Sequence, residues 1–342
     1  MKIIVDACGG DHAPLEIVRG CVDAVRELPL SIVLVGRGED ILQVLRAEGH
    51  GDIPKQIEIL HADQAVEMED NPANTLKDKP RSSMAVGLGL CAEGGGDAFV
   101  SAGSTGALLS AGTFLVKRIK GIRRAALATL LPTRTGHALL VDSGANLECT
   151  PEYLLQFAYM GSYYMEHVRK NVAPRVGLLN IGAEETKGLP LQREAFALLR
   201  GAAEEGRLNF AGNIEARDVA AGAADVVVCD GFSGNILLKT TEGVGFFFAD
   251  TIKGLFMKNA STKLAGLLVR DGIRGMKKMM DYAETGGAPL LGLAKPVIKA
   301  HGASNAKAVK NAVRQAAMLC ETGVIGAIEK NIAHMKLPGD AS

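Results

Sequence analysis

Residues Ala98–Gly106 read AFVSAGSTG: a short apolar run ends in glycines and hydroxyl side chains, and a helical pattern follows over Gly106–Ile119. A short, continuous aliphatic run predicts a strand that is covered on both faces. The glycine-rich turn then exposes backbone N–H groups at the positive end of the next helix, which suits a phosphate or a carboxylate. A tight turn with a capping hydroxyl is the alternative interpretation.

This strand–turn–helix unit repeats along the chain. Further strands are predicted at Lys2–Ala7, Ser31–Val35, Ile57–Ala62, Ala125–Leu131, His137–Asp142, Arg175–Ile181 and Asp225–Asp230. Further helices are predicted at Pro14–Arg26, Glu39–Glu48, Arg81–Glu93, Pro151–Lys170, Pro190–Glu204 and Asn235–Phe256. The alternation indicates a largely parallel sheet with helices on both faces, that is, a three-layer α/β/α fold. Because no linker or repeat interrupts the pattern, we expect a single α/β domain over residues 1–342.

Polar, glycine-rich loops follow four more of the predicted strands, namely Asp6–His12, Asp142–Asn146, Asn180–Gly188 and Cys229–Asn235. In a parallel sheet with right-handed crossovers, the carboxyl ends of the strands share one edge, and ligands bind outside that edge. We therefore expect all five loops to lie at one edge of the sheet and to build one site.

Several side chains in these loops have both a binding and a structural interpretation. Asn235, at a predicted helix start, either caps the helix or directs its amide at a ligand oxygen. Lys187 follows two acids and is either part of a solvated loop or a point charge for phosphate. His12 is a candidate hydrogen-bond or proton donor, whereas Asp11 beside it is a candidate cap. Gly87–Ala92 spells GxGxxA within a helical pattern, so it predicts no nucleotide site.

Composition excludes several classes of protein. The chain has 38 basic and 38 acidic residues, and a formal charge of zero argues against a general nucleic-acid binder. Its six cysteines lie far apart without a CxxC pair, which favours a reduced, cytoplasmic protein without a structural metal site. No apolar run approaches the ~18 residues of a membrane span.

One segment of about 30 residues, 251–280, is basic and amphipathic. Its basic side chains are Lys253, Lys258, Lys263, Arg270, Arg274, Lys277 and Lys278, against Asp271 as its acid, and leucines and methionines lie between them. Such helices suit a membrane surface or an acidic protein partner, although surface helices packed on the sheet would have the same pattern.

Six segments, in order, resemble those of the bacterial phosphate acyltransferases, the PlsX family. They are Met1–Pro14, Val100–Leu108, Val141–Asn146, Leu178–Gly188, Asp225–Gly243, and Gly286–Leu293 continuing to His301–Ser304. The chain departs from the family's usual pattern at Cys8, where methionine is usual, and at Ser104, where asparagine is usual.

The resemblance implies an activity and its partners. Members of this family transfer a fatty acyl group from acyl-[acyl carrier protein] to inorganic phosphate, and the acyl phosphate feeds phospholipid synthesis. The implied fold is similar to that of isocitrate and isopropylmalate dehydrogenases and of phosphotransacetylase. The resemblance further implies a homodimer that needs no cofactor and no metal. It implies a cytoplasmic protein with peripheral membrane contact that supplies a membrane glycerol-3-phosphate acyltransferase.

The resulting hypothesis assigns roles to the candidate residues. Phosphate would be held by Lys187, Ser104, Thr105, Gly106 and Asn146. Asn235 would donate to the thioester carbonyl oxygen as it gains charge, and His12 would stabilise the leaving thiolate. The carrier protein or lipid would contact a surface made of Lys253, Lys258, Lys263, Leu264, Leu267, Leu268 and Arg270.

Three rival functions remain open on the sequence. A nicotinamide-dependent decarboxylating dehydrogenase would need clustered metal-binding aspartates and an arginine-rich carboxylate site, and the sequence has neither. A phosphotransacetylase-like enzyme that uses acyl-CoA is not separated by the residues alone. A non-catalytic membrane adaptor would use only the basic segment, and the five polar loops argue against it.

Overall fold

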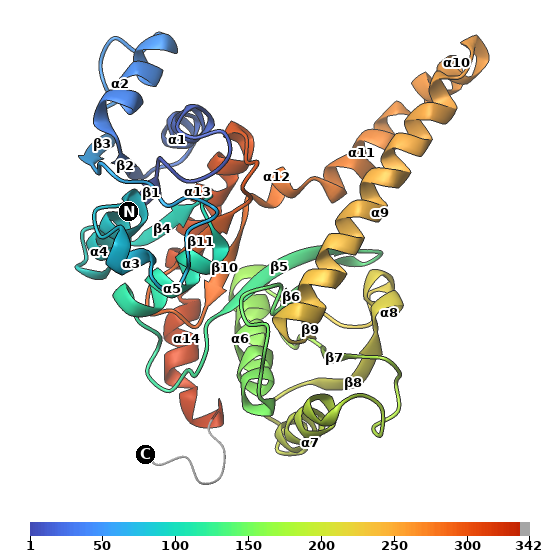
Figure 1. Cartoon of the computed structure of the whole chain (residues 1–342). Coiled ribbons are helices and arrows are strands. Elements are labelled where there is room, and N and C mark those ends of the chain that lie inside the picture. Colours follow the sequence, from blue (N-terminus) through green and yellow to red (C-terminus); the bar gives the residue numbers. More distant parts are fainter. Residues whose placement is uncertain (336–342) are drawn as a thin grey trace.

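A computed structural model describes residues 1–335, except for the side chains of residues 277–280 and 282. Its sheet contains strands β1 (Lys2–Asp6), β2 (Ser31–Gly36), β3 (Ile57–His61), β4 (Ala98–Ser101), β5 (Ala126–Thr133), β6 (Gly136–Val141), β7 (Val176–Asn180), β8 (Phe210–Glu215), β9 (Val226–Val228), β10 (Gly287–Leu291) and β11 (Val297–Ala300). Helices cover both faces, which confirms the predicted three-layer α/β/α fold (Figure 1).

The helices follow the strands in the expected alternation over most of the chain. They are α1 (Leu15–Glu27), α2 (Gly38–Ala47), α3 (Thr75–Asp78), α4 (Ser83–Ala92), α5 (Thr105–Leu115), α6 (Pro151–Arg169), α7 (Pro190–Glu204), α8 (Ala216–Ala221), α9 (Gly231–Met257), α10 (Ala260–Leu268), α11 (Arg270–Met280), α12 (Tyr282–Thr285), α13 (Ala306–Thr322) and α14 (Val324–Lys330). Strands β8, β10 and β11, the short helices α3, α8 and α12, and the helices α13 and α14 were not among the sequence predictions.

The sheet consists of two halves that run in opposite directions. Its strand order is β3-β2-β1-β4-β11-β10-β5-β6-β9-β7-β8. The first half (β3, β2, β1, β4, β11) and the second half (β6, β9, β7, β8) are each parallel inside. Between them, β10 and β5 pair antiparallel to each other and to their other neighbours. The prediction that all five loops share one sheet edge is therefore wrong, because the second half ends at the opposite edge.

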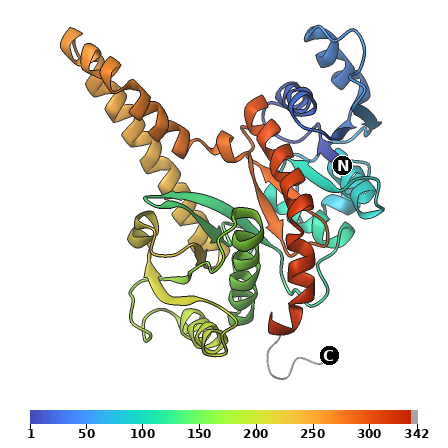
Figure 2. The ribbon, with the colours of Figure 1, turned by 180° about the vertical axis from the view of Figure 1, so that it is seen from behind.

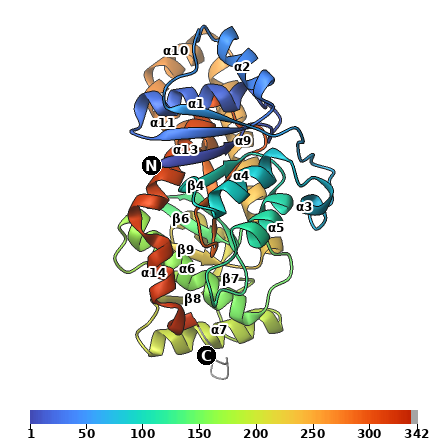
Figure 3. The same ribbon diagram turned by 90° about the vertical axis from the view of Figure 1, so that its left-hand side faces the viewer.

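Alternation along each strand divides the core between the two faces of the sheet. In β1, Ile3 and Val5 pack with α1 and α13, whereas Ile4 packs on the other face with α4 and α5. Figure 3 shows α1 and α4 on opposite sides of the sheet. Behind the sheet, α13 and α14 run beside α6 (Figure 2). A Cβ on Gly87 of α4 would overlap the ring of Phe99, so this glycine allows close helix–sheet packing. That contact explains the GxGxxA letters without a nucleotide site.

The basic segment forms a projecting arm, defined here as residues 244–280. Helix α9 extends away from the sheet, and α10 and α11 return along it (Figure 1). Among the described residues, no helix is both long enough and apolar enough to cross a membrane.

Candidate functional site

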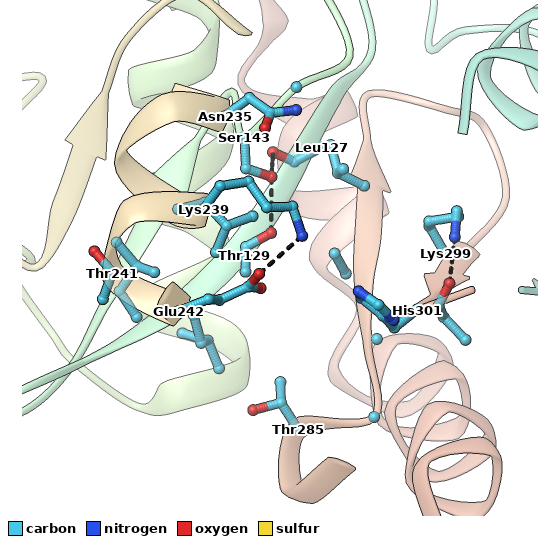
Figure 4. A pocket seen from close by; sticks show the side chains of 18 of the residues that line it. Leu127, Thr129, Ser143, Asn235, Lys239, Thr241, Glu242, Thr285, Lys299 and His301 are labelled. Carbon is cyan, nitrogen blue, oxygen red and sulfur yellow. Dashed lines mark hydrogen bonds and ion pairs between the residues drawn. The ribbon is translucent and has the colours of Figure 1, made fainter. Parts of the chain in front are cut away.

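A cavity of about 260 Å³ lies over the central antiparallel strands, between α9 of the second half and β11 of the first (Figure 4). Its lining residues are Thr105, Leu127, Thr129, Leu130, Leu131, Pro132, His137, Ser143, Gly144, Asn235, Leu238, Lys239, Thr241, Glu242, Asp281, Thr285, Gly286, Gly287, Ala288, Lys299, Ala300 and His301. The cavity thus combines an apolar wall from β5 with hydroxyl, amide and charged groups from both halves.

On the first half, the glycine-rich turn before α5 is braced by the N-terminal loop. Ser101 donates its hydroxyl to the Asp6 carboxylate at 2.7 Å and accepts the backbone N–H of Gly103 at 3.0 Å. Burial raises the pKa of Asp6, and the hydroxyl and backbone donors around it act in the opposite direction. A Cβ on Gly9 would lie 2.7 Å from the backbone nitrogen of Gly103, so the two loops meet closely. This brace positions Thr105, the first residue of α5, at the cavity.

On the second half, the loop after β6 is built around the buried carboxylate of Asp142. One oxygen accepts the backbone N–H groups of Leu127, Gly144 and Ala145 at 2.9–3.1 Å. The other accepts the backbone N–H and the side-chain amide of Asn146, both at 2.7 Å. Burial raises the pKa of Asp142, and the donors of Gly144, Ala145 and Asn146 counteract that effect. The carboxylate therefore fixes the loop that carries the cavity residues Ser143 and Gly144.

Asn235 lies over this loop. Asp230 caps α9 by accepting the backbone N–H of Ser233 at 2.8 Å, so α9 begins at Gly231, four residues earlier than predicted. The helix-capping interpretation of Asn235 is therefore wrong. Its side-chain amide lies close to Gly144: a Cβ added to Gly144 would lie 2.8 Å from the amide nitrogen of Asn235. Asn235 also lines the cavity.

Gly234 allows α9 to pack closely on the loop that contains Asp142. Substitution of Gly234 tests this contact. A Cβ on Gly234 would overlap the backbone carbonyl oxygen of Asp142, which cannot rotate away. We expect Gly234→Ala to lower the free energy of unfolding by about 2–3 kcal/mol, as overpacking does. Gly243→Ala on the same helix meets open space and should be neutral or stabilising by up to about 1 kcal/mol. Urea denaturation measures both, and equal stability of the two variants would contradict the contact.

Cationic side chains enter the cavity from both sides. Lys239 of α9 pairs with Glu242 at 2.8 Å. Lys299 of β11 lies against the backbone carbonyls of Ala102 and Ala300. Burial lowers the pKa of Lys299 to about 8, Asp11 opposes this and Lys239 adds to it. Burial also lowers the pKa of His301, again with a contribution from Lys239. The site is therefore suited to an anion.

The structure places the predicted site residues in different positions. Thr105 and Asn235 line the cavity together. The other five, Ser104, Gly106, Asn146, Lys187 and His12, are not among its lining residues. Ser104 is buried before α5, Gly106 packs on Pro72, and Asn146 donates to Asp142 and to the Ala125 carbonyl. Lys187 and His12 are exposed in their loops.

The sequence predictions omitted Thr129, Lys239, Lys299 and His301. The sequence contains a signal for each of the two lysines. Lys239 follows Asn235 by four residues and so lies on the same helix face. Lys299 interrupts the apolar run of residues 297–300, where an unpaired lysine is unusual.

The cysteines near the site are poor nucleophiles. Burial raises the pKa of Cys229 and Cys149, and Asp142 raises both further. Cys229 instead donates its S–H to the Asp142 carbonyl at 3.4 Å. A thiolate at either position is therefore disfavoured.

The arm exposes both classes of side chain predicted for a partner surface. Leu264, Leu267 and Leu268 are 63%, 62% and 81% exposed, and the basic residues Lys253, Lys258, Lys263 and Arg270 are also exposed. The side chains of Lys277 and Lys278 lie outside the described residues.

Solved structures with a similar fold include a phosphotransacetylase from Streptococcus pyogenes. It has a TM-score of 0.64 at 19% identity and covers 95% of this chain and 94% of its own. A 4-hydroxythreonine-4-phosphate dehydrogenase from Klebsiella pneumoniae has a TM-score of 0.53 at 13% identity, over 93% and 98%. The protein therefore has the α/β/α fold shared by these phosphotransacetylases and dehydrogenases.

Comparison with known sequences identifies the family to which the chain belongs. A family described as "Fatty acid synthesis protein" matches residues 1–327. Relatives named phosphate acyltransferase, from Alkaliphilus oremlandii and Heliobacterium modesticaldum, are 46% and 47% identical over 98% and 97% of this chain and 98% of each relative. The chain belongs to the phosphate acyltransferase family and is an acyltransferase, as its motifs predicted.

Proposed function

We propose that the protein transfers a fatty acyl group from acyl-[acyl carrier protein] to inorganic phosphate, giving acyl phosphate for phospholipid synthesis. The observation that carries this proposal is the composition of the cavity between α9 and β11. It combines the Asn235 amide and two lysines with an apolar wall that includes Leu127, Leu130 and Leu238. Such a wall fits an acyl chain, and the polar end fits an anion and a carbonyl oxygen.

The proposed reaction needs positioning more than acid–base catalysis. A phosphate oxygen attacks the thioester carbonyl carbon, the new C–O bond forms, and the C–S bond breaks with its electron pair on sulfur. The thiolate then takes up a proton from solvent. After phosphate attacks and before the C–S bond breaks, negative charge develops on the carbonyl oxygen. The Asn235 amide donates a hydrogen bond to that oxygen. Holding phosphate and thioester together contributes up to ~7–11 kcal/mol in favourable cases.

The identity of the donor is tested by comparing thioesters. Purified protein is supplied with long-chain acyl-[acyl carrier protein] or with the matching acyl-CoA, at equal concentration and saturating phosphate. We expect turnover on the carrier-protein thioester to exceed that on acyl-CoA. A preference for acyl-CoA would instead favour the phosphotransacetylase-like alternative, and reduction of a nicotinamide cofactor would favour the dehydrogenase.

The arm supplies the surface for the acidic carrier protein in this proposal. Lys263, at the far end of the arm, makes no ion pair among the described residues. Lys263→Glu should weaken carrier-protein binding several-fold, mainly through a slower association rate, and the effect should shrink at high salt. Lys55→Glu, an exposed lysine away from the arm, is the matched control. Equal affinities of the two variants, measured by surface plasmon resonance, would reject docking at Lys263.

The apolar side chains of the arm provide the proposed peripheral membrane contact, from which the cytoplasmic homodimer delivers acyl phosphate to a membrane glycerol-3-phosphate acyltransferase. Leu268→Glu should reduce flotation with anionic lipid vesicles, because it places a charge on an 81%-exposed leucine. Val172→Glu, at an exposed position in a loop of the second half, should float like the wild type. Unchanged flotation of Leu268→Glu would show that this face of α10 does not contact lipid.

A further inference from the structure

Lys299 occupies an unusual position for a cation. It lies in β11 between Ile298 and Ala300, both almost fully buried, and its backbone is paired with Ser101 of β4. Its ammonium contacts the Ala102 carbonyl oxygen at 3.5 Å and the Ala300 carbonyl. Among the described residues, no carboxylate lies within ion-pair distance of it. A half-buried ammonium without such a partner is unfavourable, which indicates a ligand that supplies the missing negative charge.

The second cation comes from the opposite half of the sheet. Lys239 lies on α9, and Figure 4 shows Lys239 and Glu242 on one side of the cavity and Lys299 and His301 on the other. The two lysines are close enough that the charge of Lys239 lowers the pKa of Lys299. Glu242 already pairs with Lys239, and Asp281 pairs with Lys307 at 3.2 Å. The carboxylates that line the cavity are thus engaged, while the two ammonium groups repel each other.

A helix start faces the same space. Because Lys299 pairs with Ser101, it lies beside the turn that leads into α5, and its ammonium reaches the Ala102 carbonyl of that turn. Thr105, the first residue of α5, lines the cavity with its hydroxyl side chain. The turn that the sequence predicted to bind an anion therefore meets a lysine that the sequence predictions omitted.

We propose that Lys299 and Lys239 together bind the acceptor phosphate, with Thr105 at the start of α5 as a third partner. This inference rests on the proposed function and specifies where its inorganic substrate binds. Lys239 lies one turn beyond Asn235 on α9, so one helix face presents the phosphate partner and the carbonyl partner side by side. Phosphate held there is adjacent to the thioester carbon that it attacks.

The site places phosphate away from Lys187. Lys187 is exposed in the loop after β7, where Asn180 donates its amide to the Lys187 carbonyl at 3.2 Å, and no residue of that loop lines the cavity. The two positions make different predictions for phosphate affinity, so they can be separated by kinetics.

The test measures KM for inorganic phosphate with saturating long-chain acyl-[acyl carrier protein]. Lys299→Met and Lys239→Met should each raise this KM about 10-fold or more, as expected for loss of a charge-assisted contact, with little change in the KM of the acyl donor. Lys55→Met is the control and should behave as wild type. Lys299→Arg keeps the charge and should retain most of the phosphate affinity, which also covers the case in which Lys299→Met fails to fold.

A pH profile provides a second readout. Lys299 faces Asp11 from the N-terminal loop, Lys239 from α9 and His301 beyond β11. Its ammonium is charged below pH ~8 and neutral above. Wild-type kcat/KM for phosphate should therefore fall on the alkaline side, and this fall should move to higher pH in Lys299→Arg, whose guanidinium stays charged.

Three outcomes would overturn the inference. An unchanged phosphate KM in folded Lys299→Met and Lys239→Met would do so, as would a phosphate KM that rises only in Lys187→Ala. A rise confined to the KM of the acyl donor would assign the lysines to the phosphate of the carrier's pantetheine arm instead. These results differ from failure of the proposed function, in which the wild-type protein itself shows no phosphate-dependent turnover.

Discussion

Asn235→Ala is expected to reduce acyl-phosphate formation by about 100- to 1000-fold, the usual loss when an oxyanion-hole donor is removed. The loss should appear in kcat, because the carbonyl oxygen gains its charge only in the transition state. In the structure, the proposed catalytic role of Asn235 is independent of any role in stabilising the fold. Asp230 already caps α9, so Asn235 carries no helix cap to lose. Steady-state kinetics on acyl-[acyl carrier protein] at saturating phosphate measure the effect.

The control for this prediction is stability. Alanine is a better helix former than asparagine, so Asn235→Ala should unfold at the wild-type urea concentration or slightly above it. A folded variant that retains more than about a tenth of the wild-type kcat would exclude Asn235 as an oxyanion donor. Ile236→Ala, at the exposed neighbouring position that does not line the cavity, should leave kcat unchanged.

The second large effect is expected at Asp142. Its two oxygens accept five N–H groups in a buried position, and asparagine offers one oxygen only. In Asp142→Asn, the new amide faces Asn146, whose backbone N–H is left without an acceptor and whose side-chain amide keeps only the Ala125 carbonyl. Each buried unsatisfied donor costs about 1–3 kcal/mol, so we expect a loss of roughly 2–5 kcal/mol in the free energy of unfolding.

Urea denaturation with a matched control measures this loss. Asp52→Asn changes the same side chain at an exposed loop position and should stay within about 0.5 kcal/mol of wild type. If Asp142→Asn is as stable as Asp52→Asn, the loop after β6 does not depend on the carboxylate. That loop contains the cavity residues Ser143 and Gly144. Asp142→Asn should therefore also lose activity at urea concentrations too low to unfold it.

Local patterns were sufficient to predict much of the fold. Continuous aliphatic runs gave β1, β2 and β4, and the alternation with helices gave the three layers. The reversal of direction was missed at the β5–β6 hairpin, although only Arg134 and Thr135 separate these strands and so short a connection requires antiparallel pairing. Strand β10 was missed because it reads GAPLL. A glycine and Pro289 argue against a strand by local rules, yet β10 pairs on both sides. Which neighbours a strand finds is a tertiary property that local sequence does not encode.

The same limit explains the site predictions. Thr105 and Asn235 were found because strand-end loops and helix starts are local signals. Lys299 belongs to a strand that was not predicted, and Lys239 lies within a helix whose exposed side could equally face solvent. Lys187 was predicted to bind phosphate because it lies in a polar loop after a strand. That strand, β7, belongs to the second half of the sheet, which runs opposite to the first half, so its loop lies at the other edge from the glycine-rich turn before α5. The sequence thus predicts that the site contains hydroxyl, amide and lysine side chains. It predicts less well which of these residues line the same cavity.

Hydroxylamine trapping tests the central claim most directly. Purified protein is incubated with long-chain acyl-[acyl carrier protein], with and without inorganic phosphate, and acyl phosphate is trapped as the acyl hydroxamate, with an enzyme-free reaction to subtract direct aminolysis of the thioester. We predict that hydroxamate forms in step with release of free carrier protein, and only when phosphate and enzyme are both present. Equal hydroxamate with and without phosphate, or none above the enzyme-free reaction, would contradict acyl transfer to phosphate.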